Sequence, residues 1–401
     1  MHKVFCKIES KSFMHIVQFV HPDFLNSHSM PRFAQMIADG MRARGHEVDT
    51  WTARPLAYSF PAPTRLKKWL GYIDQFMLFP LQVHWRLRRL QADTLFIFGD
   101  QALGPWVPLV AHRPHVIHVH DLMALRSSLG EFVQNPTGWT GRKYQSLIRR
   151  GFSRGSRFVS VSENTREQLQ RFLPHKPDVS EVIYNGLNYP FRPMTAVESA
   201  AALQPAGAAM PPSGFLLHVG GNEWYKNRLG VIEMYQAYAQ QTENPLPLWL
   251  VGSSPTLTIR ELAQGIKGKG EIRFLSNLSN EQVCAAYSAA RLLLFPSLAE
   301  GFGWPIAEAM ASGCLVLTTG EAPMTEVGGD AAFYIPRKPA PPADEWAALA
   351  GASILKILQR TPDEVSNRQQ LGFGQVARFN AEQTLNAYER IYQQALESCR
   401  E

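Results

Sequence analysis

The stretch that most constrains the fold lies at residues 292–319 of the 401-residue chain. Its first four residues, 292–295, form an apolar run short enough to be a buried strand, and a glycine-containing turn follows at 300–303. Small residues with helical spacing occupy 305–312, and a second apolar run closes the stretch at 314–318. This order predicts a βαβ unit whose turn lies at the carboxyl end of the first strand. Open α/β sheets bind ligands at that edge, so the turn is the first candidate for a binding site.

The turn has the chemistry of a site for phosphate or sugar oxygens. Gly301 and Gly303 let a ligand come close to backbone N–H groups, and the following helix adds the partial positive charge of its N-terminus. Glu300 and Glu308 flank the turn with seven residues between them, and carboxylates accept hydrogen bonds from a polyhydroxylated ligand. Each glutamate taken singly has an ordinary alternative: Glu300 as a loop charge and Glu308 as a solvated helix residue.

The whole pattern, EGFGWPIAEAMASG starting at Glu300, resembles the E-x7-E donor-site signature of the retaining GT-B glycosyltransferases of family 4. The resemblance implies an α/β chain of GT-B type, in which two Rossmann-like, doubly wound parallel-sheet domains face each other across a cleft. It also implies that Glu300 contacts the hydroxyls of the donor sugar and that Glu308 contacts the ribose of the nucleotide. Gly301, Phe302 and Gly303 are then donor-binding residues as well.

The length of the chain suits two domains of ordinary size better than one, and a composition of 45% hydrophobic and 18% charged residues supplies core material for both. Alternating strand and helix patterns predict about six strands in each half. An alanine- and proline-rich stretch without apolar periodicity is typical of a linker. The predicted divisions are a tail at 1–13, an N-terminal acceptor-binding domain at 14–195, a linker at 196–213, a C-terminal nucleotide-sugar-binding domain at 214–378, and a helix at 379–401 that crosses back to the first domain, as in GT-B proteins.

In the first half, the predicted loop at residues 21–28 contains no glycine. Many members of the family that the chain resembles have a glycine-rich loop there, which approaches the donor phosphate. Ser29 is the expected N-cap of the next helix, and its amide and hydroxyl are the candidates to replace that contact. A later turn at 162–165 resembles the family's V-S-E-N-T turn, which places Asn164 at the cleft.

A predicted strand ends at His120 and Asp121, at the ligand-binding edge of the sheet. The pair resembles the family's H-D motif, which implies that His120 lies near the reacting sugar and the acceptor while Asp121 anchors the loop. A structural histidine and a metal site are the alternatives. His118 and His120 are two residues apart, so they point to opposite faces of a strand, which argues against a shared ion.

The second half opens with a predicted strand followed by Gly220 and Gly221, with Lys226 close behind. Backbone N–H groups and one mobile cation suit a diphosphate, although the spacing is not that of a P-loop. In the family that the chain resembles, an arginine follows the first glycine. Gly221 takes that place here, so Arg228 is the candidate for the missing cation, and Asn227 is assigned to the same donor site.

Two further strand ends, at Gly252 and Ser276, resemble the points where the family's backbone reads the nucleobase. Glycosyl transfer needs stabilisation of charge on the leaving diphosphate and a sugar held in line with the acceptor. Lys226, Glu300 and His120 are therefore the predicted catalytic residues. No D-x-D motif occurs, so neither a metal nor a cofactor beyond the nucleotide sugar is expected. The resemblance implies retention of configuration by a front-side mechanism, in which the leaving phosphate takes the acceptor proton.

The net charge of +6 indicates anionic partners; basic residues interleave with aromatic ones at 65–90, and a second basic patch spans 142–157. One interpretation is contact with an anionic membrane surface, and the other is amphipathic helices packed on the sheet with solvated charges. The basic residues follow no nucleic-acid-binding motif. The scattered cysteines, the polar first residues and the lack of an apolar run of about 20 residues predict a cytoplasmic location, with peripheral contact at the inner membrane face as an option.

The pattern as a whole predicts a retaining glycosyltransferase that moves a hexose from GDP-mannose or a UDP-sugar to a glycan or lipid-linked acceptor of a cell-surface polysaccharide, such as an O-antigen or exopolysaccharide. One alternative is another GT-B reaction, either sugar-nucleotide epimerisation or a sucrose- or starch-type synthesis. A second alternative is a non-catalytic subunit that binds a nucleotide sugar, which the glycine at position 221 keeps open.

Overall fold

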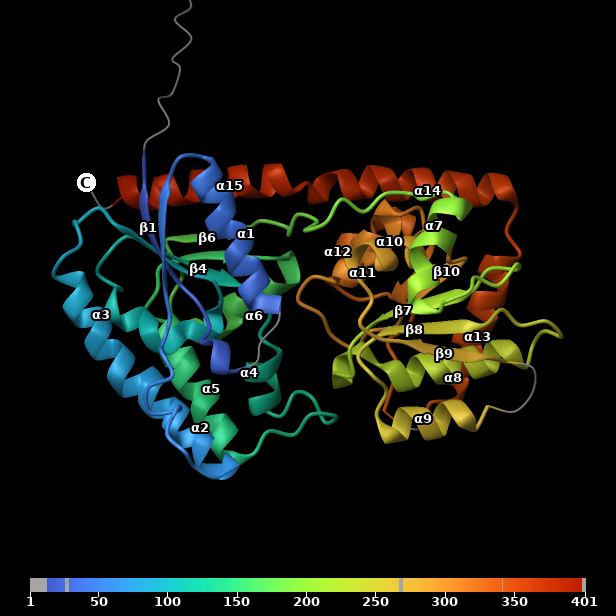
Figure 1. Cartoon of the computed structure of the whole chain (residues 1–401), viewed down its shortest axis with the longest axis horizontal. Helices are drawn as coiled ribbons and strands as arrows, with labels where there is room; N and C mark the ends of the chain where they lie inside the picture. The colour runs from blue at the N-terminus through green and yellow to red at the C-terminus, as the bar shows by residue number, and fades with distance from the viewer. Residues whose placement is uncertain (1–12, 26–28, 267–269, 341, 399–401) are drawn as a thin grey trace, which may run out of the picture.

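The computed structural model describes residues 13–25, 29–266, 270–340 and 342–398, which form two halves built on separate parallel sheets (Figure 1). Within these residues each sheet has six strands. From edge to edge, the first sheet consists of β2 (Glu47–Trp51), β1 (His15–Phe19), β3 (Leu95–Phe98), β4 (His115–Val119), β5 (Arg157–Ser160) and β6 (Val179–Val182). The second consists of β12 (Phe333–Ile335), β11 (Val316–Thr319), β10 (Leu292–Phe295), β7 (Leu216–Gly220), β8 (Leu248–Gly252) and β9 (Ile272–Leu275).

The central strands are short apolar runs that are buried on both faces, as expected for parallel strands between two layers of helices. Every residue of β3 and β10 is buried. Neighbouring strands pair in parallel, with Ile16 of β1 beside Leu95 of β3, and Leu293 of β10 beside Leu217 of β7. The predicted α/β fold class and the prediction of about six strands per half are confirmed for the described residues.

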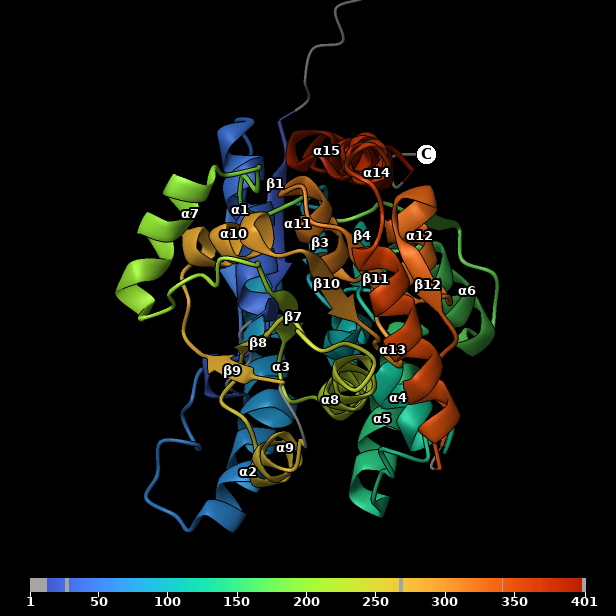
Figure 2. The ribbon, with the colours of Figure 1, turned by 90° about the vertical axis from the view of Figure 1, so that its right-hand side faces the viewer.

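Helices cover both faces of each sheet (Figures 1 and 2). One face of the first sheet packs against α1 (Ser29–Ala43) and α15 (Ala381–Glu397), and the other against α3 (Phe79–Leu87), α4 (Met123–Ser128), α5 (Trp139–Phe152) and α6 (Glu163–Phe172). Helix α2 (Thr64–Ile73) contacts α5 through the stacked rings of Tyr72 and Tyr144. One face of the second sheet packs against α7 (Ala196–Leu203), α10 (Asn280–Ala289), α11 (Trp304–Ala311) and α12 (Met324–Gly328), and the other against α8 (Arg228–Ala239), α9 (Leu257–Gln264) and α13 (Asp344–Leu358). Figure 2 shows α14 (Pro362–Val376) and α15 nearly end-on.

The predicted linker at 196–213 contains helix α7, which packs into the second half. The side chain of Thr195 and that of Glu198 form a reciprocal capping box at its start. Alanine has high helix propensity, and Leu203 is the one large apolar residue of this short helix that is buried, so the sequence shows no apolar stripe there. The predicted tail at 1–13 lies outside the described residues except for its last residue.

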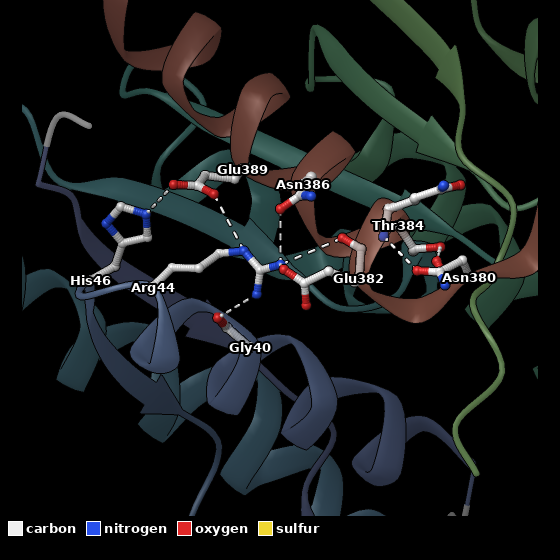
Figure 3. A network of polar contacts seen from close by, with 9 residues as sticks. Gly40, Arg44, His46, Asn380, Glu382, Thr384, Asn386 and Glu389 are labelled. Atoms are coloured by element: carbon white, nitrogen blue, oxygen red, sulfur yellow. Dashed lines mark hydrogen bonds and ion pairs between the residues drawn. The ribbon is translucent and has the colours of Figure 1, made fainter. Parts of the chain in front are cut away.

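Helix α15 crosses back from the second half onto the first (Figure 1). Its apolar residues Leu385, Tyr388, Ile391 and Tyr392 are buried in the core of the first half. Arg44, at the end of α1, binds this helix through an Nη2 hydrogen bond of 3.0 Å to Asn386 Oδ1 and an ion pair with Glu389, 3.3 Å from Nε (Figure 3). His46 Nδ1 accepts a hydrogen bond from the N–H of Met14, so Nε2 carries the proton that faces Glu389 Oε1 at 3.1 Å. This network links the segments beside β1 and α1 to α15 and holds that helix on the first half.

Candidate active site

The carboxyl ends of β4, β7 and β10 converge where the two halves meet. Lys226 lies in a short turn after β7, and Glu300 lies in the loop after β10. Lys226 Nζ is 2.8 Å from Oε1 and 3.1 Å from Oε2 of Glu300. The two side chains are only 15% and 7% exposed, so this is a shielded ion pair. The structure thus brings together the two charged residues that were predicted to hold a sugar diphosphate.

The glycine turn after Glu300 is in direct contact with the first half. A Cβ built on Gly301 would lie 2.0 Å from the backbone oxygen of His120. The carbonyl of Gly301 accepts hydrogen bonds from Ser162 Oγ at 2.8 Å and from Thr165 Oγ1 at 3.2 Å. Ser162 is also the N-cap of α6, with its side chain accepting a hydrogen bond from the N–H of Thr165. The β10–α11 turn is therefore fixed to the first half by backbone contact and by two hydroxyl groups.

Glu326, on helix α12 of the second half, makes another contact across the junction. Its carboxylate accepts hydrogen bonds from the backbone N–H groups of Glu163 at 2.7 Å and Asn164 at 2.9 Å. These are free amides of the first turn of α6, where a negative charge is favourable. Asn164 was predicted at the cleft and does lie at the junction, through its amide. No spacing or motif in the sequence pointed to Glu326.

His120 and Asp121 follow β4 at this junction. The Nε2 atom of His120 lies 3.0 Å from the carbonyl oxygen of Gly99, and its ring packs edge-on against Phe33 with the ring centres 4.2 Å apart. Burial lowers the pKa of His120, which the negative charge of Asp100 only partly offsets, so the ring is neutral at pH 7.

Asp121 anchors the loop, as predicted, because its Oδ1 accepts a hydrogen bond of 3.0 Å from the N–H of Met123. Burial raises the pKa of Asp121 to about 6, and the negative charges of Asp100 and Glu300 add to the shift. The junction therefore brings Asp121 and Glu300 close to each other, with Lys226 as a nearby cation.

The neighbouring His118 points to the opposite face of β4, where its Nε2 lies 2.7 Å from the hydroxyl of Tyr392 on α15. Burial lowers the pKa of His118 to about 3, so it is a neutral core residue. No group of three His, Cys, Asp or Glu side chains in the described part of the chain is arranged to hold a metal ion. Cys284 and Cys314 are buried free thiols, and the other two cysteines lie outside the described residues.

Glu308 lies on α11, the helix that follows the turn. Its Oε2 accepts a hydrogen bond of 2.9 Å from the hydroxyl of Tyr287. Burial raises the pKa of Glu308 to about 7, although the Tyr287 hydrogen bond and the charge of Lys226 act in the opposite direction. The carboxyl group therefore changes its protonation state near neutral pH.

We expect Glu308 to make the protein less stable as the pH rises. At pH values between the ordinary pKa of a glutamate and about 7, the folded protein holds a proton at Glu308 that the unfolded chain has released. Its favourable contribution is complete below the ordinary pKa and is lost as the pH rises through 7. Urea unfolding at pH 5 and pH 8 should show that Glu308→Gln removes up to about 3 kcal/mol of this loss. The same pH dependence in both proteins would contradict the assignment.

The glycine loop after β7 departs from the expected arrangement. The carboxylate of Glu223 folds over Gly221, where a built Cβ would lie 2.1 Å from Oε2. Arg228 is buried beneath the loop, and its Nη1 donates to Asn222 Oδ1 at 2.5 Å and to the carbonyl oxygen of Ser253 at 2.7 Å. Its Nε and Nη2 atoms have no hydrogen-bond partner among the described residues. Arg228 thus supports the loop from below, and its predicted contact with a donor phosphate stays a prediction.

Two residues predicted at the donor site, Asn227 and Phe302, have side chains that are occupied inside the protein, so their contact with a donor stays a prediction. Asn227 has a left-handed backbone with φ of 54°, and its amide accepts from the N–H of Gly230 at 3.2 Å and donates to the carbonyl of Pro296 at 2.9 Å. It caps α8 and ties that helix to the loop after β10. Phe302 is 3% exposed and packs edge-on against Phe379, with ring centres 5.3 Å apart, so only its backbone is left to contact a ligand.

The remaining predicted residues lie on the turns of the second half. Gly252 has φ of +131°, and a Cβ there would lie 2.1 Å from the backbone oxygen of Gly220, so this glycine lets β7 and β8 approach. Ser276 lines a hollow of about 470 Å³ beside these strand ends. Gly303, with φ of +105°, precedes α11. Ser29 begins α1, but its side chain lies outside the described part, so its predicted role is untested.

Each half of the chain matches a known protein family. The family described as Glycosyltransferase Family 4 matches residues 30–189, and the family described as Glycosyl transferases group 1 matches residues 207–348. The chain is 30% identical to the O-antigen chain mannosyltransferase B of Escherichia coli over 58% of this chain and 60% of that protein. It is 23% identical to the O-antigen chain mannosyltransferase RfbU of Salmonella typhimurium over 69% of this chain and 70% of that protein.

Solved structures share the fold. HepE from Anabaena, in complex with UDP and glucose, superposes with a TM-score of 0.65 at 18% identity, over 94% of this chain and 98% of that one. Sucrose-phosphate synthase from Thermosynechococcus elongatus superposes with a TM-score of 0.71 at 18% identity, over 96% of this chain and 100% of that one. With both family matches in chain order and a GT-B fold of two Rossmann-like halves, the chain belongs to the glycosyltransferases of family 4, group 1.

Proposed function

We propose that this chain is a retaining glycosyltransferase that transfers a hexose from a nucleotide-diphosphate sugar to a glycan or lipid-linked acceptor during synthesis of a cell-surface polysaccharide. The observation that carries the proposal is the ion pair of Lys226 and Glu300 at the edge of an amide-rich glycine turn, where the two halves meet. The names of the two curated relatives favour mannose as the sugar and an O-antigen as the product. We therefore propose GDP-mannose as the first donor to test and UDP-hexoses as the second.

In the proposed reaction the bond between the sugar C1 and the diphosphate oxygen breaks, and a bond from C1 to the acceptor oxygen forms. Lys226 would release Glu300 and stabilise the negative charge that develops on the diphosphate, together with the backbone N–H groups of Gly301 and Gly303. Glu300 would then accept hydrogen bonds from the sugar hydroxyls, and Glu308 those from the ribose. The acceptor oxygen attacks C1 on the face from which the diphosphate leaves, so the configuration at C1 is retained. The leaving phosphate takes the acceptor proton, so no separate base is needed.

The test uses the purified chain with each donor and a lipid-linked oligosaccharide acceptor. We expect release of the nucleoside diphosphate that depends on the acceptor, activity that survives a metal chelator, and an α-linked product from an α-linked donor, detected by proton NMR. Conversion of the donor sugar without acceptor would instead favour an epimerase. Tight donor binding with no turnover would favour a non-catalytic subunit. This is the second candidate, because Glu223 folds over Gly221, at the place where the family has an arginine.

A further inference from the structure

The basic and aromatic stretch of the first half forms one long helical rod. Helix α2 continues without a break through a π-helical turn, Asp74–Leu78, into α3, so that residues 64–87 are helical throughout. Pro80 lies in the first turn of α3, where it lacks a backbone N–H for the helical ladder, which is a physical reason for the altered turn. At about 1.5 Å per residue, the rod is about 36 Å long.

The inner face of the rod packs on the first half. Gly71, Gln75, Phe79 and Val83, each four residues after the last, are buried, and the carbonyl of Gln75 accepts a hydrogen bond of 2.9 Å from the Trp106 indole. This face is therefore covered by the rest of the first half, and it contains few of the large apolar residues of the rod.

The outer face is apolar at the same spacing. Six large apolar side chains lie there with between 37% and 68% of their surface exposed: Leu66, Trp69, Ile73, Met77, Leu81 and Trp85. Of the twenty exposed large apolar residues in the described part of the chain, eight fall between residues 56 and 85. Isolated apolar residues on a surface are ordinary, but a continuous stripe of this length marks an interaction surface. The alternative of helices that merely expose solvated charges does not account for it.

The charge around the stripe has one sign. Exposed basic side chains flank it at both ends: Arg65, Lys68, Arg88 and Arg89. Asp74 is the only acidic residue between positions 54 and 92, and it is buried, with its carboxylate accepting hydrogen bonds of 2.8 Å from the N–H groups of Ala57 and Tyr58. Helix α5 adjoins the rod, since Tyr144 stacks on Tyr72, and it adds exposed Trp139 with four more basic residues and no acid.

We propose that the outer face of residues 64–87 lies flat on the surface of an anionic phospholipid bilayer. The stripe would enter the boundary between headgroups and acyl chains, and the flanking arginine and lysine residues would contact lipid phosphates. A second copy of this chain is a poor occupant, because two such faces would bring like charges together with no acid to pair them. Among the described helices, none is long and apolar enough to cross a membrane, so the contact proposed is peripheral.

The test is co-sedimentation of the full chain with vesicles of phosphatidylcholine alone and of an equal mixture with phosphatidylglycerol. We expect binding to the anionic vesicles only, reduced by high salt. The triple variant Trp69→Ser, Met77→Ser, Leu81→Ser should bind roughly tenfold or more weakly, and so should Arg88→Glu, Arg89→Glu. A matched triple at exposed apolar residues elsewhere, Val197→Ser, Leu257→Ser, Leu371→Ser, should bind like the wild type.

The substituted side chains are exposed, so circular dichroism should show all variants folded. Equal binding of both triples, or equal binding to neutral and anionic vesicles, would overturn the proposal. Sedimentation velocity tests the alternative of a second copy. The proposal would be overturned if the wild type formed a dimer that the Trp69, Met77, Leu81 triple disrupts and did not bind vesicles. Nucleotide-sugar turnover in solution tests the proposed enzyme activity separately, because the rod contributes none of the residues assigned to the donor.

Discussion

Replacing Lys226 with methionine should lower kcat by about two to three orders of magnitude, because a cation aimed at the leaving diphosphate is removed. Its ammonium group is confined between Glu300, 2.8 Å away, and the rings of Tyr225 and Phe295, each little more than 5 Å away. Methionine fills similar space without the charge. The effect belongs in kcat, measured with saturating donor and acceptor, because the diphosphate charge grows as the C1–O bond breaks.

The chain offers a matched control in Lys338. This lysine also pairs with a glutamate, Glu233, and lies over the ring of Trp346, and its side chain is 12% exposed, close to the 15% of Lys226. It lies on the face of the second sheet covered by α8 and α13, away from the junction. Lys338→Met should cost a similar amount of stability and leave kcat unchanged. A kcat for Lys226→Met within threefold of that of Lys338→Met would remove Lys226 from the proposed machinery.

The features that could be predicted from the sequence are mostly those that depend on residues close together in the chain. Buried strands such as β10 are short apolar runs between turn residues, so their positions and their number were predictable. The apolar series of α15 likewise showed which face is buried. The meeting of Lys226 with Glu300 also followed, because loops at the carboxyl ends of adjacent parallel strands share one edge of the sheet, and β7 pairs with β10.

The remainder depends on contacts between distant segments, which leave no local pattern. Glu326 binds the amides of α6 more than 160 residues away, so nothing near it in the sequence indicates that role. Asn227 was assigned to the donor site because it lies in the glycine loop, and the sequence did not show that its side chain also caps α8. The stretch at 65–90 was recognised as basic and aromatic, yet which face is covered depends on Gly71 and Phe79 meeting the first half.

Gly301→Ala should reduce kcat/KM by about a hundredfold or more, since misplacement of a reacting group by about 1 Å has an effect of that size. The new methyl group would lie 2.0 Å from the backbone oxygen of His120, and a backbone atom cannot rotate away as a side chain can. The two halves must therefore separate at this point. That movement also weakens the hydrogen bonds from Ser162 and Thr165 to the carbonyl of residue 301 and carries Glu300 away from the sugar.

Gly374→Ala is the control, because this exposed glycine of α14 has open space around its Cβ position. It should leave kcat/KM unchanged and raise the free energy of unfolding by up to about 1 kcal/mol through helix propensity. For Gly301→Ala, nucleotide affinity should fall much less than kcat/KM, because most residues assigned to the nucleotide, Ser29 excepted, lie in the second half. Small-angle X-ray scattering should show a larger radius of gyration for Gly301→Ala than for Gly374→Ala. If Gly301→Ala keeps wild-type kcat/KM with an unchanged radius, contact of this turn with His120 is not needed for transfer, and the reacting groups must be aligned by other contacts between the halves.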